Sequence, residues 1–98
     1  MRRACVEKLA GTFKLATIVH PRAYVSPEAS IGAGCVIEPG CVVYRNVVLG
    51  ESCLVNAGAV LDHDCTVEAY CQIGCNAVVA ARAVVSEGTK VQHGEVVE

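Results

Sequence analysis

Three ionisable side chains, Asp62, His63 and Asp64, stand side by side between the apolar residues Leu61 and Cys65. A neutral imidazole titrates near physiological pH and can take up a proton, and an adjacent carboxylate can fix its tautomer and stabilise the imidazolium. His63 and Asp64 are therefore candidates for a general base and its orienting carboxylate. Because burying unpaired charges is very costly, these side chains must be exposed, mutually satisfied or functional.

The overall composition excludes several classes of protein. A chain of 98 residues has room for one domain. Its net charge of -2, with no basic run beyond Arg2 and Arg3, offers no electrostatic footprint for nucleic acid or an anionic membrane. It contains no apolar run of the roughly 20 residues that a transmembrane helix needs, and no signal-peptide core follows the two arginines. We expect a cytoplasmic protein with small-molecule or protein partners.

A branched aliphatic residue recurs at every sixth position of the chain, without a change of phase. The series is Val19, Val25, Ile31, Ile37, Val43, Leu49, Val55, Leu61, Val67, Ile73, Val79, Val85, Val91 and Val97. A small residue, usually apolar, stands two positions before most of them. A large aliphatic, a turn and a small residue in every six predict a chain that repeatedly makes a short strand and then a corner.

Cysteine fills the small position in five hexads, at Cys35, Cys41, Cys53, Cys65 and Cys71. Unpaired cysteine packs as a small buried hydrophobe. A disulfide framework would suit a secreted chain with an even count, but this chain has seven cysteines. A zinc site would call for Cys-x-x-Cys spacing or clustered histidines, and neither occurs. We therefore predict free core thiols and no metal, and we disfavour a disulfide among the stacked Cys35, Cys53 and Cys71.

This hexapeptide repeat resembles that of the hexapeptide acyltransferases, whose left-handed parallel β-helix closes one triangular coil with three hexads. The resemblance covers residues 17–98 and supplies the handedness, which periodicity cannot fix. It implies an all-β domain of fourteen hexads, between four and five coils. Residues 1–16 are expected to form a short helical or irregular cap over the first coil.

Several aliphatics are followed directly by glycine or asparagine, at Gly32, Gly50, Asn56 and Gly74. Tight turns often need unusual backbone angles that these residue types tolerate, so we expect the turns to have such angles there. In this register Leu61 points inward, and Asp62, His63 and Asp64 form the corner that follows it. The three ionisable side chains are thus predicted to lie outside the core.

The segments LVNAGAVLDHDCTV and ATIVHPRAYVSPEASIGAGCVI resemble the sialic acid O-acetyltransferase and UDP-amino-sugar N-acetyltransferase family, whose members carry a His-Asp-Cys or His-Glu-Cys corner. The resemblance implies that His63 is the general base, that Asp64 orients it, and that Asn56 lies near the reaction centre. A turn asparagine that tolerates left-handed backbone is an equally good explanation of Asn56.

The same resemblance implies acetyl-CoA as the acyl donor, bound between the prisms of a homotrimer, and a sugar or sugar nucleotide as the acceptor. Gln72, Ala80, Ala81 and His93 fall at coenzyme-site positions of the family, and surface exposure is the alternative for His93. Gln72 replaces a histidine that the family often has.

Two further departures from the family concern the segment after Val79 and the ends of the chain. Ala80, Ala81 and Arg82 replace a glycine-containing turn, and Arg82, one coil from Asp64, could pair with that carboxylate. Family members also carry an N-terminal sugar-nucleotide-binding domain and further C-terminal coils, and we expect this chain to lack both.

Two functions of different classes fit this pattern. One is an acetyl-CoA-dependent acetyltransferase that uses His63 and Asp64. The other is a catalytically inactive β-helical trimer, a truncated paralogue or assembly scaffold, in which both residues form a solvated corner. A γ-type carbonic anhydrase shares the fold but needs three zinc-binding histidines, two of them closely spaced, and the wide spacing of His20, His63 and His93 disfavours it.

Overall fold

Fourteen strands of two residues each make up the regular structure of the computed structural model, which describes residues 16–98. The strands are β1 (Ile18–Val19), β2 (Tyr24–Val25), β3 (Ser30–Ile31), β4 (Val36–Ile37), β5 (Val42–Val43), β6 (Val48–Leu49), β7 (Leu54–Val55), β8 (Val60–Leu61), β9 (Thr66–Val67), β10 (Gln72–Ile73), β11 (Val78–Val79), β12 (Val84–Val85), β13 (Lys90–Val91) and β14 (Val96–Val97). Each strand ends on an aliphatic of the six-residue series. The predicted cap lies outside the described residues, apart from Ala16.

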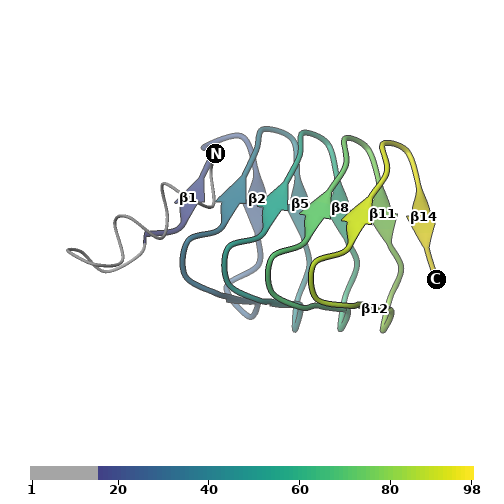
Figure 1. Cartoon of the computed structure of the whole chain (residues 1–98). Coiled ribbons are helices and arrows are strands. Elements are labelled where there is room, and N and C mark those ends of the chain that lie inside the picture. Colours follow the sequence, from purple (N-terminus) through teal and green to yellow (C-terminus); the bar gives the residue numbers. More distant parts are fainter. Residues whose placement is uncertain (1–15) are drawn as a thin grey trace.

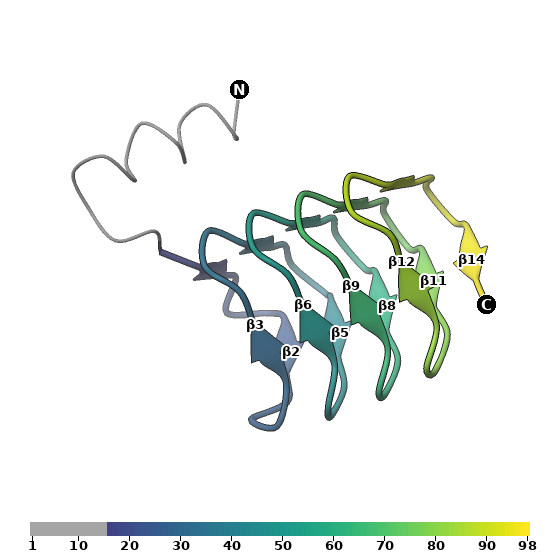
Figure 2. The ribbon, with the colours of Figure 1, turned by 60° about the horizontal axis from the view of Figure 1, so that its bottom comes forward.

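The strands stack into three parallel sheets that form the faces of a triangular prism (Figure 1; Figure 2). Face A contains β1, β4, β7, β10 and β13; face B contains β2, β5, β8, β11 and β14; face C contains β3, β6, β9 and β12. Each strand pairs with the strand one coil away, as in the Val43, Leu61 and Val79 ladder. The arrangement confirms the predicted left-handed β-helix of hexapeptide repeats.

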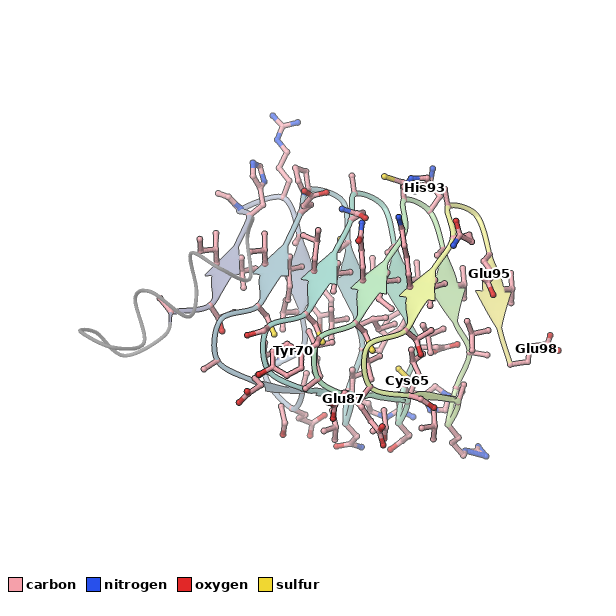
Figure 3. All side chains as sticks on the ribbon, viewed as in Figure 1. Cys65, Tyr70, Glu87, His93, Glu95 and Glu98 are labelled. Atoms are coloured by element: carbon pink, nitrogen blue, oxygen red, sulfur yellow. The ribbon has the colours of Figure 1, made fainter. Side chains whose placement is uncertain are left out.

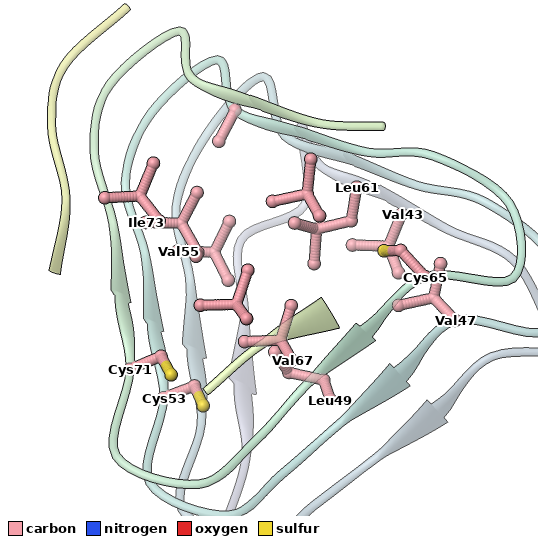
Figure 4. Packing of buried hydrophobic residues seen from close by; sticks show 14 of the residues in the cluster. Val43, Val47, Leu49, Cys53, Val55, Leu61, Cys65, Val67, Cys71 and Ile73 are labelled. Carbon is pink, nitrogen blue, oxygen red and sulfur yellow. The ribbon is translucent and has the colours of Figure 1, made fainter. Parts of the chain in front are cut away.

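The inward residue of each strand supplies the core. Val43, Val55, Leu61, Val67, Ile73 and Val79 are fully buried, with 0% of their surface exposed (Figure 4). The small residues at the corners pack between these ladders, so that the core is continuous from one coil to the next. Outward residues of the same strands alternate with inward ones, as the pleat of a strand requires.

The five cysteines at the small position of the repeat are buried, as predicted, and several of their thiols also donate hydrogen bonds. The thiols of Cys35, Cys53 and Cys71 lie 3.1, 3.2 and 3.0 Å from the carbonyl oxygens of Gly50, Glu68 and Ser86, each fifteen residues ahead. The hydroxyl of Thr17 donates in the same way to the carbonyl of Gly32 at 2.8 Å. Burial raises the pKa of the Cys65 thiol to about 11 and raises that of Cys71, so these groups stay protonated at neutral pH.

The left-handed backbone falls at the third residue after each aliphatic from Ile31 to Val91, not at the first. The non-glycine residues with this conformation are Asn46, Ser52, Asp64, Tyr70, Asn76 and Arg82, and five glycines share it, Gly34, Gly40, Gly58, Gly88 and Gly94. Our prediction for Gly32, Gly50, Asn56 and Gly74 was therefore wrong. The three glycines are needed for close approach instead, since a Cβ on Gly50 would lie 2.6 Å from the backbone nitrogen of Ala69 in the next coil.

We predict that Gly50→Ala destabilises the fold by about 1 to 3 kcal/mol, because the added Cβ forces two backbones apart. The measurement is the free energy of unfolding in urea. Ser30→Ala, on an exposed outward position of β3, is the control and should change it by less than about 0.5 kcal/mol. Equal stability of the Gly50 variant and the wild type would contradict the close approach.

Candidate active site

His63 and Asp64 lie on the corner between faces B and C, directly after β8, and their side chains are joined by a hydrogen bond. Nδ1 of His63 is 2.9 Å from Oδ2 of Asp64, and 30% and 41% of the two side chains are exposed. An ionised carboxylate can only accept a hydrogen bond, so Nδ1 must carry the proton. In neutral His63 the other ring nitrogen, Nε2, is then the one that can accept a proton from a substrate.

Backbone contacts between coils hold this corner in place. The amide of Asp64 donates to the carbonyl of Arg45 one coil earlier at 3.1 Å, and the amide of Arg82 donates to the carbonyl of His63 at 3.2 Å. Within the corner, the amide of His63 donates to Oδ1 of Asp62 at 2.7 Å. Asp64 has a left-handed backbone, with φ of 63°, which aspartate tolerates better than most residues. The corner is therefore a rigid turn held from both sides.

The charge on Asp64 is stabilised mainly by His63. The hydrogen bond with His63 lowers the pKa of the Asp64 carboxyl, and the side chain of Asn46 and the positive charge of Arg45 lower it further. The carboxylate therefore stays ionised at neutral pH. The suggested pairing of Arg82 with Asp64 is not found, because the carboxylate is engaged by His63.

Asn56 lies on a different corner, between faces A and B, where it links three coils. Its Nδ2 donates to Oε1 of Glu38 at 3.1 Å, and its Oδ1 accepts a hydrogen bond from Nε2 of Gln72 at 3.2 Å. Glu38 also accepts the amide of Ala57 at 3.1 Å. The interpretation of Asn56 as a left-handed turn residue was wrong, since its φ is not positive. The contact of Glu38 with Asn56 was not predicted. Glu38 stands one full coil before Asn56 in the sequence, and this spacing could have indicated the contact.

His93 lies on the same A–B corner, two coils after Asn56 (Figure 3). Its Nδ1 accepts the backbone amide of Cys75 at 2.7 Å, and the residue is exposed, in agreement with the alternative of a surface position. Cys75 is the half-buried cysteine of this corner.

The predicted site residues thus divide between two corners of one chain. The B–C corner holds His63 and Asp64, with Ala80 and Ala81 one coil further on. The A–B corner and the adjoining edge of face A hold Asn56, Gln72 and His93. These corners are the two edges of face B, so a single chain does not bring all the predicted residues together.

Three wider features of residues 16–98 bear on the kind of site. No group of three or more His, Cys, Asp or Glu residues in this range could hold a metal ion. The described part of the chain encloses no pocket. None of the described residues forms a helix long and apolar enough to cross a membrane.

Comparison with known proteins relates both the repeat and the fold to transferases. Residues 46–81, which include the His63 corner, match the bacterial transferase hexapeptide (six repeats) family. No curated protein sequence matches the chain significantly. The acetyltransferase domain of PglB from Neisseria gonorrhoeae is 31% identical, with a TM-score of 0.77 over 99% of this chain and 57% of that one.

Two further solved structures contain ligands. The same PglB domain in complex with acetyl coenzyme A is 31% identical, with a TM-score of 0.75 over 94% of this chain and 54% of that one. A histidine-to-asparagine mutant of perosamine N-acetyltransferase from Caulobacter crescentus, in complex with CoA and GDP-perosamine, is 28% identical, with a TM-score of 0.70 over 99% of this chain and 57% of that one. The chain thus spans little more than half the length of these proteins. Residues 46–81 thus carry the hexapeptide repeats of this transferase family, and the fold of the chain is similar to that of these acetyltransferases.

Proposed function

We propose that the protein transfers an acetyl group from acetyl-CoA to a hydroxyl or amine of a sugar or sugar nucleotide, with His63 as the general base. The observation that carries this proposal is the His63–Asp64 pair, which leaves Nε2 of a half-exposed imidazole free. The similar structures in complex with acetyl coenzyme A, and with CoA and GDP-perosamine, support the substrate class. Buried cysteine thiols suit the reducing cytoplasm in which we expect the protein to act.

In this mechanism Nε2 of His63 removes the proton of the acceptor as its oxygen or nitrogen attacks the thioester carbonyl carbon. The new C–O or C–N bond forms, the C–S bond breaks, and the proton passes from the imidazolium to the departing thiolate. Asp64 keeps the proton on Nδ1 and stabilises the positive charge that develops on the ring. No covalent enzyme intermediate is needed.

We further propose that the site is completed by a homotrimer in which face B of each chain lines a common axis. The outward residues of face B are all apolar: Tyr24, Val42, Val60, Val78 and Val96. Faces A and C are less uniform, since Gln72 and Lys90 interrupt face A and Ser30 and Thr66 interrupt face C. A continuous apolar face that no other part of the described chain covers favours association with another chain.

A threefold arrangement around face B would also join the two corners. When three prisms turn face B inward, the B–C corner of each chain lies beside the A–B corner of the next. His63 and Asp64 of one chain would then face Asn56 and Gln72 of its neighbour, and acetyl-CoA would lie in the groove between Ala80 and Ala81 on one side and His93 on the other. Both groups of predicted residues would serve one site.

Acetyl-CoA at millimolar concentration should stabilise the wild-type chain, because a ligand that binds only the folded state raises its stability by roughly 2.7 kcal/mol at one hundred times its Kd. The measurement is thermal unfolding with and without the ligand. If Tm does not change, the result contradicts the proposed acetyltransferase function and favours a non-catalytic β-helical trimer.

His63→Ala should reduce kcat by about 10² to 10⁴, the usual contribution of a general base. The assay follows release of the CoA thiol with any sugar acceptor that the wild type acetylates. Asp64→Asn should also slow turnover while keeping the fold, because asparagine tolerates the left-handed backbone of this corner. His20→Ala, on the first A–B corner, is the control. Unchanged kcat in the His63 variant would exclude it as the base.

Val60→Lys should convert the trimer into monomers of 10.2 kDa, because the lysine places a charge at the middle of face B. Light scattering after size-exclusion chromatography measures the mass. Val84→Lys, at an exposed apolar position of face C, is the matched control and should leave the trimer intact. A wild-type monomer, or a trimer of the Val60 variant, would overturn this assembly.

A further inference from the structure

Arg82 has a backbone conformation that its residue type disfavours. Its φ of 64° lies in the left-handed region, where a Cβ crowds the following carbonyl and where glycine or asparagine is preferred. Asn46, Asp64 and Asn76 are residue types that accept this conformation readily. Tyr70, which does not, gains a hydrogen bond from its hydroxyl to Oε1 of Glu51 at 3.0 Å.

The side chain of Arg82 has no such compensation. Within residues 16–98 its guanidinium makes no ion pair and no hydrogen bond, and only its backbone amide is engaged, by the carbonyl of His63. The carboxylate one coil away, that of Asp64, is already paired with His63 at 2.9 Å. The protein thus keeps an exposed arginine, with all its donors unused, at a position where glycine would be less strained.

Arg82 lies next to the residues of the proposed active site. Arg82 stacks on Asp64 with the offset of one coil, and its amide bonds directly to the residue proposed as the base. On the other side, one coil earlier, stands Arg45, whose positive charge lowers the pKa of the Asp64 carboxyl. Two arginine residues therefore stand one coil to either side of the His63–Asp64 pair along the prism axis.

We propose that Arg82 binds a phosphate group of a substrate that reaches the His63 corner. A planar guanidinium presents paired donors that match phosphate oxygens, and such charged hydrogen bonds are strong. The inference rests on the proposed function and adds to its site a residue that binds a substrate phosphate. The phosphate could belong to the coenzyme of the acetyl donor or to the diphosphate of a sugar-nucleotide acceptor, and the experiment separates these two sources.

The test compares Arg82→Gly, Arg82→Lys and wild type in thermal unfolding and in calorimetric titration with acetyl-CoA and, separately, with GDP. Phosphates are the only anionic groups of both probes. Arg82→Gly should raise Tm, because it relieves the left-handed strain, and should weaken binding of at least one probe by roughly tenfold to one hundredfold. It should also reduce the salt dependence of that Kd. Arg82→Lys, which keeps the charge, should lose much less affinity.

Arg22→Gly is the matched control, because Arg22 is exposed and occupies the same hexad position in the first coil without a left-handed backbone. This variant should not raise Tm, and it should leave the affinity for both probes unchanged. A loss confined to acetyl-CoA assigns the phosphate to the donor, and a loss confined to GDP assigns it to the acceptor.

The results that would overturn the inference are distinct from those that would overturn the function. If wild type binds acetyl-CoA or GDP and Arg82→Gly binds them equally well, Arg82 has no role in binding and the inference alone fails. If wild type binds neither probe, the proposed function fails and the inference falls with it.

Discussion

The whole structure depends on the backbone hydrogen bonds that join each coil to the next. Every strand has only two residues, so no strand is stable by itself, and each owes its place to partners one coil away. The approach is close enough that Gly50 has no room for a Cβ. A strict six-residue phase follows from this constraint, since one inserted residue would turn an inward aliphatic outward.

The same constraint leaves certain positions free for chemistry. In most hexads the inward aliphatic and the small residue belong to the core, and the third residue after the aliphatic must accept a left-handed backbone. The second residue has neither duty. His63 occupies such a position, while Asp64 meets the backbone requirement of its own position and still pairs with the imidazole. The proposed catalytic pair therefore costs the fold little.

The strands could be predicted from the sequence, because the core sets the period of the aliphatic residues. The turn geometry could not be predicted. Ser52, Tyr70 and Arg82 adopt left-handed backbone although their residue types do not signal it, and the crowding at Gly32, Gly50 and Gly74 arises between coils. The pairing of His63 with Asp64 follows from adjacency. The contact of Glu38 with Asn56, and the separation of Asn56 from His63, depend on which residues share a corner, which requires the three-dimensional register.

The position of the His63 corner along the prism has a consequence for its mobility. A solenoid whose units contact only their neighbours loses order from its ends, where a coil has one partner instead of two. The corner lies in the third coil, with β5 on one side of β8 and β11 on the other. Fraying that reaches His63 must first open the outer coils, so hydrogen exchange at this corner should report the opening of most of the domain rather than a local fluctuation.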